Sequence, residues 1–195
     1  MPRKSKQNAE KLRVVAYHEA GHAVAELAYG RQFEYVTIVP DGEFLGQVHV
    51  GEEWSKSFAR KKEENEGTGL IDLGSLVCSM LGAFAEKEVT GRFNNRHARL
   101  DSDFTDGTLS QRDLFSHWAG YRPIKPPRTA EHLWLAARGE ANAIVSLFWP
   151  AIEAIAKALL EKKTLTYDEA TQIHCAAMKA GFGQTRGSKG VRHAP

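Results

Sequence analysis

The chain has 195 residues, of which 42% are hydrophobic and 26% charged, and its formal net charge is +2. This length suits one compact globular domain with a core large enough to fold without disulfide staples. The small net charge gives no sign of a nucleic-acid partner, and we expect none.

The two ends of the chain are basic. We expect a flexible N-terminus over residues 1–9, a single domain over residues 10–180 and a flexible tail over residues 181–195. The N-terminus lacks the apolar stretch of a signal peptide. The apolar segment 141–160 is interrupted by Pro150, Glu153 and Lys157, so we expect no membrane span.

The chain has two cysteines, Cys78 and Cys175, which form no CxxC pair. We interpret both as reduced, buried small hydrophobic residues, and we expect no cysteine zinc site. Reduced thiols and the absence of membrane signals together predict a cytoplasmic protein.

Residues 10–29 are predicted to form a helix that ends near Gly30. This segment contains His18-Glu19-Ala20-Gly21-His22, an HExxH motif. Histidines four residues apart lie about 40° apart around a helix, so both rings can reach one metal ion. Glu19 projects close to that metal without being one of the pair, and is placed to take a proton from water.

The motif fixes only three positions, so two histidines on an ordinary helix are the alternative interpretation. Gly21 argues against that alternative, because glycine costs roughly 1 kcal/mol relative to alanine inside a helix. We therefore expect a close approach to the helix at Gly21.

The next elements are predicted strands at residues 33–39 and 44–50, which a turn at residues 40–42 joins as a hairpin. Residues 51–69 are predicted to form a charged loop, partly helical at its middle or without a helix, and we assign no chemistry to it. Helices are expected at residues 70–89, 101–118, 130–148 and 151–162. Pro150 either begins the last of these or kinks one longer helix. Thr166 and Glu169 form a capping box that opens a final helix.

Zinc catalysis requires three protein ligands and one open position. The third ligand must come from outside the HExxH helix, and spacing alone leaves several carboxylates and one histidine open. Glu86 is either a ligand or a group that orients or caps. The candidates are Glu86, His97, Asp101, Asp103 and Asp106.

Several blocks, in order, resemble the peptidase domain of the FtsH-type AAA proteases. VVAYHEAGHAVAELAYG is similar to the zinc helix of that family, and VTIVPDGEFLG to the strand and turn after it. LGAFAEKEVTG and SDFTDGTL resemble later blocks, and residues 133–173 resemble its C-terminal helices. The resemblance covers about residues 12–173.

The resemblance implies zinc ligands at His18, His22 and Asp103, with Glu19 as the catalytic base. It also implies a mostly α (α+β), zincin-like domain with a small β-hairpin or sheet near the active site. Proteolysis of unfolded or extended polypeptide follows as the expected activity. The hairpin either holds substrate by strand addition or only packs, and no substrate-binding residue is assigned.

The chain departs from the family at several points. The family has Arg where Ala83 stands and Arg-Gly in place of Asp41-Gly42, and NNRHARLDS replaces its glycine-rich approach to the ligand aspartate, so Asp101 stays a rival to Asp103. There is no GxxxxGK[ST] motif, and we expect a peptidase domain standing alone without an ATPase module.

We therefore expect an ATP-independent zinc metalloendopeptidase. The alternative is an inactive protein of peptidase fold that binds zinc or peptides in a regulatory role. Besides the polypeptide substrate, the possible partners are a separate AAA unfoldase and further copies of the chain.

Overall fold

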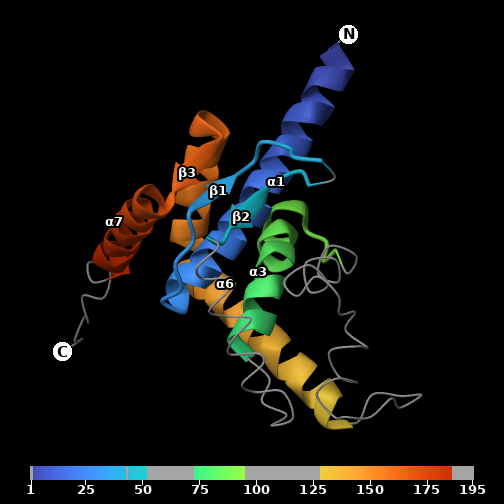
Figure 1. Ribbon diagram of the computed structural model, residues 1–195, viewed down its shortest axis with the longest axis vertical. Helices are drawn as coiled ribbons and strands as arrows, with labels where there is room; N and C mark the ends of the chain where they lie inside the picture. The colour runs from blue at the N-terminus through green and yellow to red at the C-terminus, as the bar shows by residue number, and fades with distance from the viewer. Residues whose placement is uncertain (1, 43, 52–72, 95–127, 186–195) are drawn as a thin grey trace, which may run out of the picture.

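The computed structural model describes residues 2–42, 44–51, 73–94 and 128–185 (Figure 1). Within these residues the chain forms four helices and three short strands in the order α1, β1, β2, α3, α6, β3, α7. The predicted fold class, mostly helical with a small sheet, is confirmed.

Helix α1 spans Pro2–Ala28 and carries the HExxH motif. It begins at Pro2 rather than at Glu10, so most of the basic N-terminal segment continues the helix. Proline suits a first helical position, and the Lys, Gln, Ala and Glu residues that follow are good helix formers. The helix ends as predicted at Gly30, whose φ of 66° allows the Arg31 amide to bond the Glu26 carbonyl at 2.8 Å.

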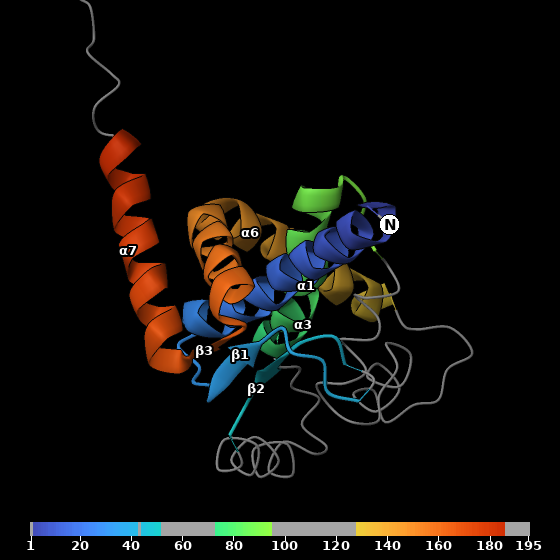
Figure 2. The same ribbon diagram turned by 90° about the horizontal axis from the view of Figure 1, so that it is seen from above.

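Helix α1 packs against α3 (Leu73–Thr90) and α6 (Arg128–Lys162), which also pack against each other, and Figure 2 shows the three helices from above. The three helices share one hydrophobic core. The contact with α3 is close at Gly21, where a Cβ would lie 2.7 Å from the Leu81 carbonyl oxygen and 2.9 Å from the Ala85 Cβ. The close approach predicted from Gly21 is confirmed, and the neighbour is a helix.

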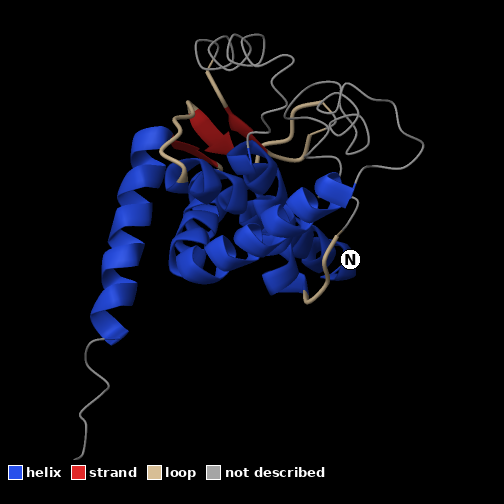
Figure 3. Ribbon diagram, turned by 90° about the horizontal axis from the view of Figure 1, so that it is seen from below, coloured by secondary structure: helices blue, strands red, loops and turns tan. Residues whose placement is uncertain are grey.

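The sheet contains β1 (Tyr35–Thr37), β2 (Gln47–His49) and β3 (Thr164–Thr166), all antiparallel, in the order β2-β1-β3. It lies on one side of the helices, next to α1 (Figures 2 and 3). The hairpin of β1 and β2 was predicted, although its strands are shorter than expected. Strand β3 was not predicted, because three residues between two helices carry too little pattern to read.

Helix α6 continues through Pro150. Of the two predicted alternatives, one longer helix that contains Pro150 is therefore confirmed. From Leu135 to Lys162 it is, among the described residues, the one helix long and apolar enough to cross a membrane by length and composition, and 33% of that apolar window is buried. It packs against α1, α3 and α7. The expectation of no membrane span stays a prediction.

Helix α7 spans Tyr167–Thr185 and packs along α6 at the edge of the molecule (Figure 2). The predicted capping box is confirmed, because the Thr166 amide donates to Glu169 at 3.0 Å and the Glu169 amide donates to Thr166 Oγ1 at 3.3 Å. The hydrogen bond from Lys162, followed by that from Thr166, lowers the pKa of Glu169.

Both cysteines are free, as expected. Cys78 is buried, but the prediction that Cys175 is buried was wrong. Cys175 lies on the solvent side of α7, whereas the neighbouring His174 turns toward Phe148 of α6. The predicted loop after Gly51 and the predicted helix at 101–118 lie outside the described residues.

Candidate metal centre

The two histidines of the motif point toward each other from α1. Their Nε2 atoms are 3.1 Å apart and their ring centroids 4.8 Å apart. Both side chains are half-buried, and Glu19 between them in sequence is buried. The i, i+4 spacing therefore places the rings as the sequence predicted.

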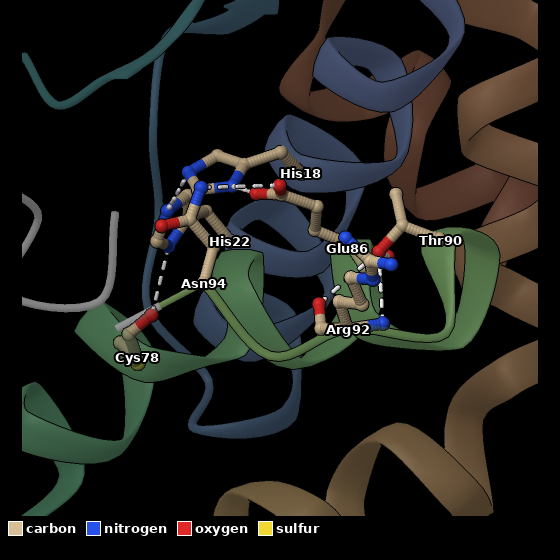
Figure 4. A network of polar contacts seen from close by, with 7 residues as sticks. All are labelled: His18, His22, Cys78, Glu86, Thr90, Arg92 and Asn94. Atoms are coloured by element: carbon tan, nitrogen blue, oxygen red, sulfur yellow. Dashed lines mark hydrogen bonds and ion pairs between the residues drawn. The ribbon is translucent and has the colours of Figure 1, made fainter. Parts of the chain in front are cut away.

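The other nitrogen of each ring faces an acceptor from α3 (Figure 4). His22 Nδ1 lies 2.8 Å from the carbonyl oxygen of Cys78, and His18 Nδ1 lies 3.5 Å from a carboxylate oxygen of Glu86. A carbonyl only accepts, so His22 Nδ1 carries a proton and the Nε2 of neutral His22 carries a lone pair. Glu86 Oε2, 3.5 Å from Nδ1 of His18, is an acceptor placed to favour the same tautomer of His18.

This arrangement fits a cation between the two Nε2 atoms. Two lone pairs that face each other at 3.1 Å repel unless a proton or a metal ion lies between them. Ligand nitrogens at 2.0–2.1 Å from tetrahedral zinc are about 3.3–3.4 Å apart, close to the spacing here. Metal-binding histidines also commonly donate their second N–H to a carboxylate or a backbone carbonyl, as these two are placed to do.

Gly82 of α3 keeps space beside the two ring nitrogens. A Cβ at this position would lie 2.7 Å from Nε2 of His18 and closer still to Nε2 of His22. Any side chain here would occupy the volume in front of both Nε2 atoms. Glycine at 82 therefore leaves a cradle that suits a small ion, and the residues present fit a metal.

Gly46, just before β2, lies against the catalytic-base candidate. A Cβ there would be 2.8 Å from Glu19 Oε1 and 2.8 Å from the carbonyl oxygen of Thr37. The chain entering β2 therefore covers Glu19 closely, which explains the burial of this carboxylate. Glu19 is held beside the histidines and beneath the start of β2.

Four candidates for a third ligand, Asp103, Asp101, His97 and Asp106, lie outside the described residues. Within the part of the chain that the structure describes, no group of three or more metal-binding side chains occurs. Glu86 is described, and it faces Nδ1 of His18 rather than the Nε2 pair. This placement suits the orienting role that the sequence left open for Glu86.

A second polar cluster lies on the other side of Cys78. Arg31 Nη1 is 3.8 Å from Cys78 Sγ, and its guanidinium stacks on the ring of Tyr29. Tyr29 donates a hydrogen bond to Glu140 of α6. Burial, then that hydrogen bond to Glu140, raises the pKa of Tyr29 well above its ordinary value. Tyr29, which directly follows α1, is therefore a neutral donor that connects the end of α1 to α6.

Sequence reasoning missed the roles of Gly82, Gly46 and the Cys78 carbonyl. Gly82 lies in the block LGAFAEKEVTG, and its place in a helix, where glycine is unfavourable, was a usable signal. No signal existed for the carbonyl, because every residue has one and only packing decides which of them meets a histidine.

A buried carboxylate next to paired histidines on a helix, with His22 Nδ1 on a backbone carbonyl and Glu86 3.5 Å from His18 Nδ1, fits what a zinc hydrolase centre requires. Comparison with known proteins agrees at the level of the family. The chain is 27% identical to ATP-dependent zinc metalloprotease FtsH 2 of Methylacidiphilum infernorum, over 84% of this chain and 29% of that protein. It is 32% identical to FtsH of Mycoplasmopsis pulmonis, over 65% of this chain and 17% of that protein. It is 29% identical to FtsH of Neorickettsia risticii, over 89% of this chain and 30% of that protein.

No family model matches the chain. The chain spans 17% to 30% of the length of these three relatives. The matches support an FtsH-related family and, at that level, a zinc metalloprotease.

Proposed function

We propose that the chain is a zinc metalloendopeptidase that hydrolyses unfolded or extended polypeptide without ATP. The observation that carries this proposal is the His18–His22 pair, whose Nε2 atoms face each other at 3.1 Å while each Nδ1 faces an acceptor. The relatives named as zinc metalloproteases support the choice of metal and reaction.

In this proposal His18 and His22 hold the zinc ion together with Asp103, for which the family resemblance is the support. Asp101 is the rival, and Glu86 orients His18. Bound zinc supplies Lewis-acid chemistry, which polarises a carbonyl and makes water a better nucleophile.

Glu19 is the general base. Its carboxylate is buried beneath Gly46 and adjoins the first histidine in sequence, so it takes a proton from the attacking water and delivers it to the leaving amine. A structural zinc site has no need of this carboxylate, and its presence favours the enzyme over the regulatory alternative. The regulatory alternative is favoured by the altered sequence blocks, such as Ala83 where the family has Arg.

The substrate is an extended chain that pairs with β2. Within the described residues β2 has β1 on one side and no strand on the other, and the proposed substrate strand adds along this outer edge. Gly46 at the start of β2 touches Glu19, so a peptide on this edge would pass the centre. The nearby turn also exposes apolar side chains, Val39, Phe44 and Leu45, that suit unfolded polypeptide.

The proposed activity acts on substrates that are already unfolded. A separate AAA unfoldase is the partner that would extend it to folded proteins, and assembly of several copies is part of the same proposal. We propose a cytoplasmic location.

The test uses the zinc-loaded protein and casein, an unfolded substrate, with and without a chelator. We expect cleavage without ATP that the chelator stops. Glu19→Gln should keep zinc and the fold but lose about 10²–10⁴-fold in rate, because an amide cannot accept the water proton. Glu88→Gln, at an exposed position of α3, is the matched control.

If the zinc-loaded protein cleaves no unfolded polypeptide, even with candidate AAA partners added, the chain is not an enzyme of this kind. The regulatory alternative then takes the place of the peptidase hypothesis. Equal rates for Glu19→Gln and the unsubstituted protein would show that another group is the base.

A further inference from the structure

A chain of polar contacts passes through the two histidines and ends at Asn94, which follows α3 (Figure 4). Asn94 Nδ2 donates to Glu86 Oε1 at 3.4 Å, and Glu86 Oε2 lies 3.5 Å from His18 Nδ1. At the other end, His22 donates to the carbonyl of Cys78, which is part of the α3 backbone and therefore rigid. At the His18 end, these two contacts are made by side chains.

The turn after α3 is built to bring Asn94 back to the helix. Gly91 has a φ of 71°, and its amide bonds the Lys87 carbonyl at 2.8 Å, which ends the helix. Thr90 Oγ1 donates to the Glu86 carbonyl at 2.9 Å and accepts the Arg92 amide at 3.3 Å. The chain therefore reverses and reaches Glu86 again, eight residues before Asn94.

The packing of Phe93 anchors this reversal. Its ring lies 4.7 Å from that of Phe84 on α3, and the guanidinium of Arg138 on α6 lies 5.1 Å from its centre. Asn94 is thus the next residue after an anchored aromatic ring, so its side chain is placed by the tertiary packing of two helices.

Glu86 needs a second partner of this kind. Its side chain is buried, and a buried carboxylate is costly unless its oxygens accept hydrogen bonds. It also has three rotatable bonds, so each contact that it makes restricts its orientation. A donor on Oε1 leaves Oε2 directed at the histidine.

We propose that Asn94 is a positioning residue of the metal centre, which holds Glu86 so that the carboxylate keeps His18 in the tautomer and orientation that present Nε2 to zinc. The proposal rests on the proposed function for its metal. Asn94 acts through Glu86 and does not itself hold the metal or touch the substrate.

The first measurement is zinc affinity by competition with a chromophoric chelator. Loss of a group that orients a ligand typically costs about 10–100-fold in affinity, and the long contacts here favour the lower end, so we expect Asn94→Ala to bind about 10-fold more weakly. Asn142→Ala, at an exposed position of α6, should bind as the unsubstituted protein does. Thermal unfolding of each zinc-free variant checks that the fold is kept.

A double-mutant cycle tests the route through Glu86. If Asn94 acts only through this carboxylate, Asn94→Ala should cost little more in a protein that already carries Glu86→Gln. An equal 10-fold loss in both backgrounds would overturn the proposal, as would unchanged affinity in Asn94→Ala alone.

The tautomer of His18 gives a readout that needs no zinc. Side-chain ¹⁵N chemical shifts of the zinc-free protein should show His18 protonated at Nδ1, and Asn94→Ala should increase the other tautomer. An unchanged His18 spectrum in Asn94→Ala would overturn the positioning role, whether or not the protein cleaves casein. If Asn94→Ala weakens zinc binding and changes the His18 tautomer but the protein cleaves no casein, the positioning role stands. That result would contradict only the proposed peptidase function.

Discussion

Gly82 is the single residue on which the space in front of the two histidine rings depends. The cradle in front of the two Nε2 atoms is present because no Cβ projects from α3 at this point. Glycine is unfavourable inside a helix by about 1 kcal/mol relative to alanine, so its presence here has a cost that the site explains.

We predict that Gly82→Ala weakens zinc binding by at least 10-fold, because the added methyl group would lie within van der Waals distance of both histidine rings and displace them. Zinc affinity and circular dichroism measure this effect. Gly139→Ala on α6 is the control, since nothing lies within 4 Å of its added Cβ, and it should raise helix stability by up to about 1 kcal/mol. A folded Gly82→Ala protein with full zinc affinity would show that the metal does not use this cradle.

At the scale of elements, α7 is attached by one face to α6, and a histidine lies in that contact. His174 packs on the ring of Phe148 at 5.4 Å, and its Nδ1 is buried with no hydrogen-bond partner among the described residues. Burial lowers the pKa of His174 below its ordinary value of 6.5. The neutral ring is thus the form that fits the packed helix.

This shift has a definite sign for stability. As the pH falls through about 6.5, the unfolded chain takes up a proton at this histidine before the folded chain does, so the free energy of unfolding decreases. Above that pH both states are neutral and the contribution is complete. We predict that His174→Gln reduces the loss of stability between pH 7.5 and 5.5, measured as urea midpoints. An identical pH dependence in the two proteins would show that His174 is not desolvated in solution.

At the scale of the whole molecule, zinc should couple segments that are far apart in the chain. The histidines lie on α1, their partners on α3, and the proposed third ligand Asp103 in a later segment. A ligand that binds only the folded state at 100 times its dissociation constant stabilises that state by about 2.7 kcal/mol. For a chain of this size, this free energy corresponds to a rise of about 5–11 °C in Tm.

We predict that zinc raises the Tm of the unsubstituted protein by this amount and that chelation reverses the rise. His22→Ala and Asp103→Ala should lose most of it, whereas Asp101→Ala should keep it. If Asp101→Ala loses the zinc-induced rise in Tm and Asp103→Ala keeps it, the third ligand is Asp101 rather than Asp103. Differential scanning fluorimetry over a zinc titration distinguishes these outcomes.

The sequence by itself determined the features that depend on neighbours a few residues away. The spacing of His18 and His22, the helix end at Gly30 and the capping box of Thr166 and Glu169 are all set within one or two turns, where local geometry is nearly fixed by residue type. Gly21 was informative for the same reason, because its local cost signalled a close contact without revealing the partner.

Only the tertiary structure decided what meets the histidines. The carbonyl that binds His22 is 56 residues away in the chain, and Glu86, Gly82 and Gly46 come to the centre through packing of α3 and the sheet on α1. Strand β3 likewise exists because β1 offers it an edge, with Leu165 opposite Val36. Such contacts depend on which surfaces are buried together, and burial is a property of the folded chain rather than of any short segment.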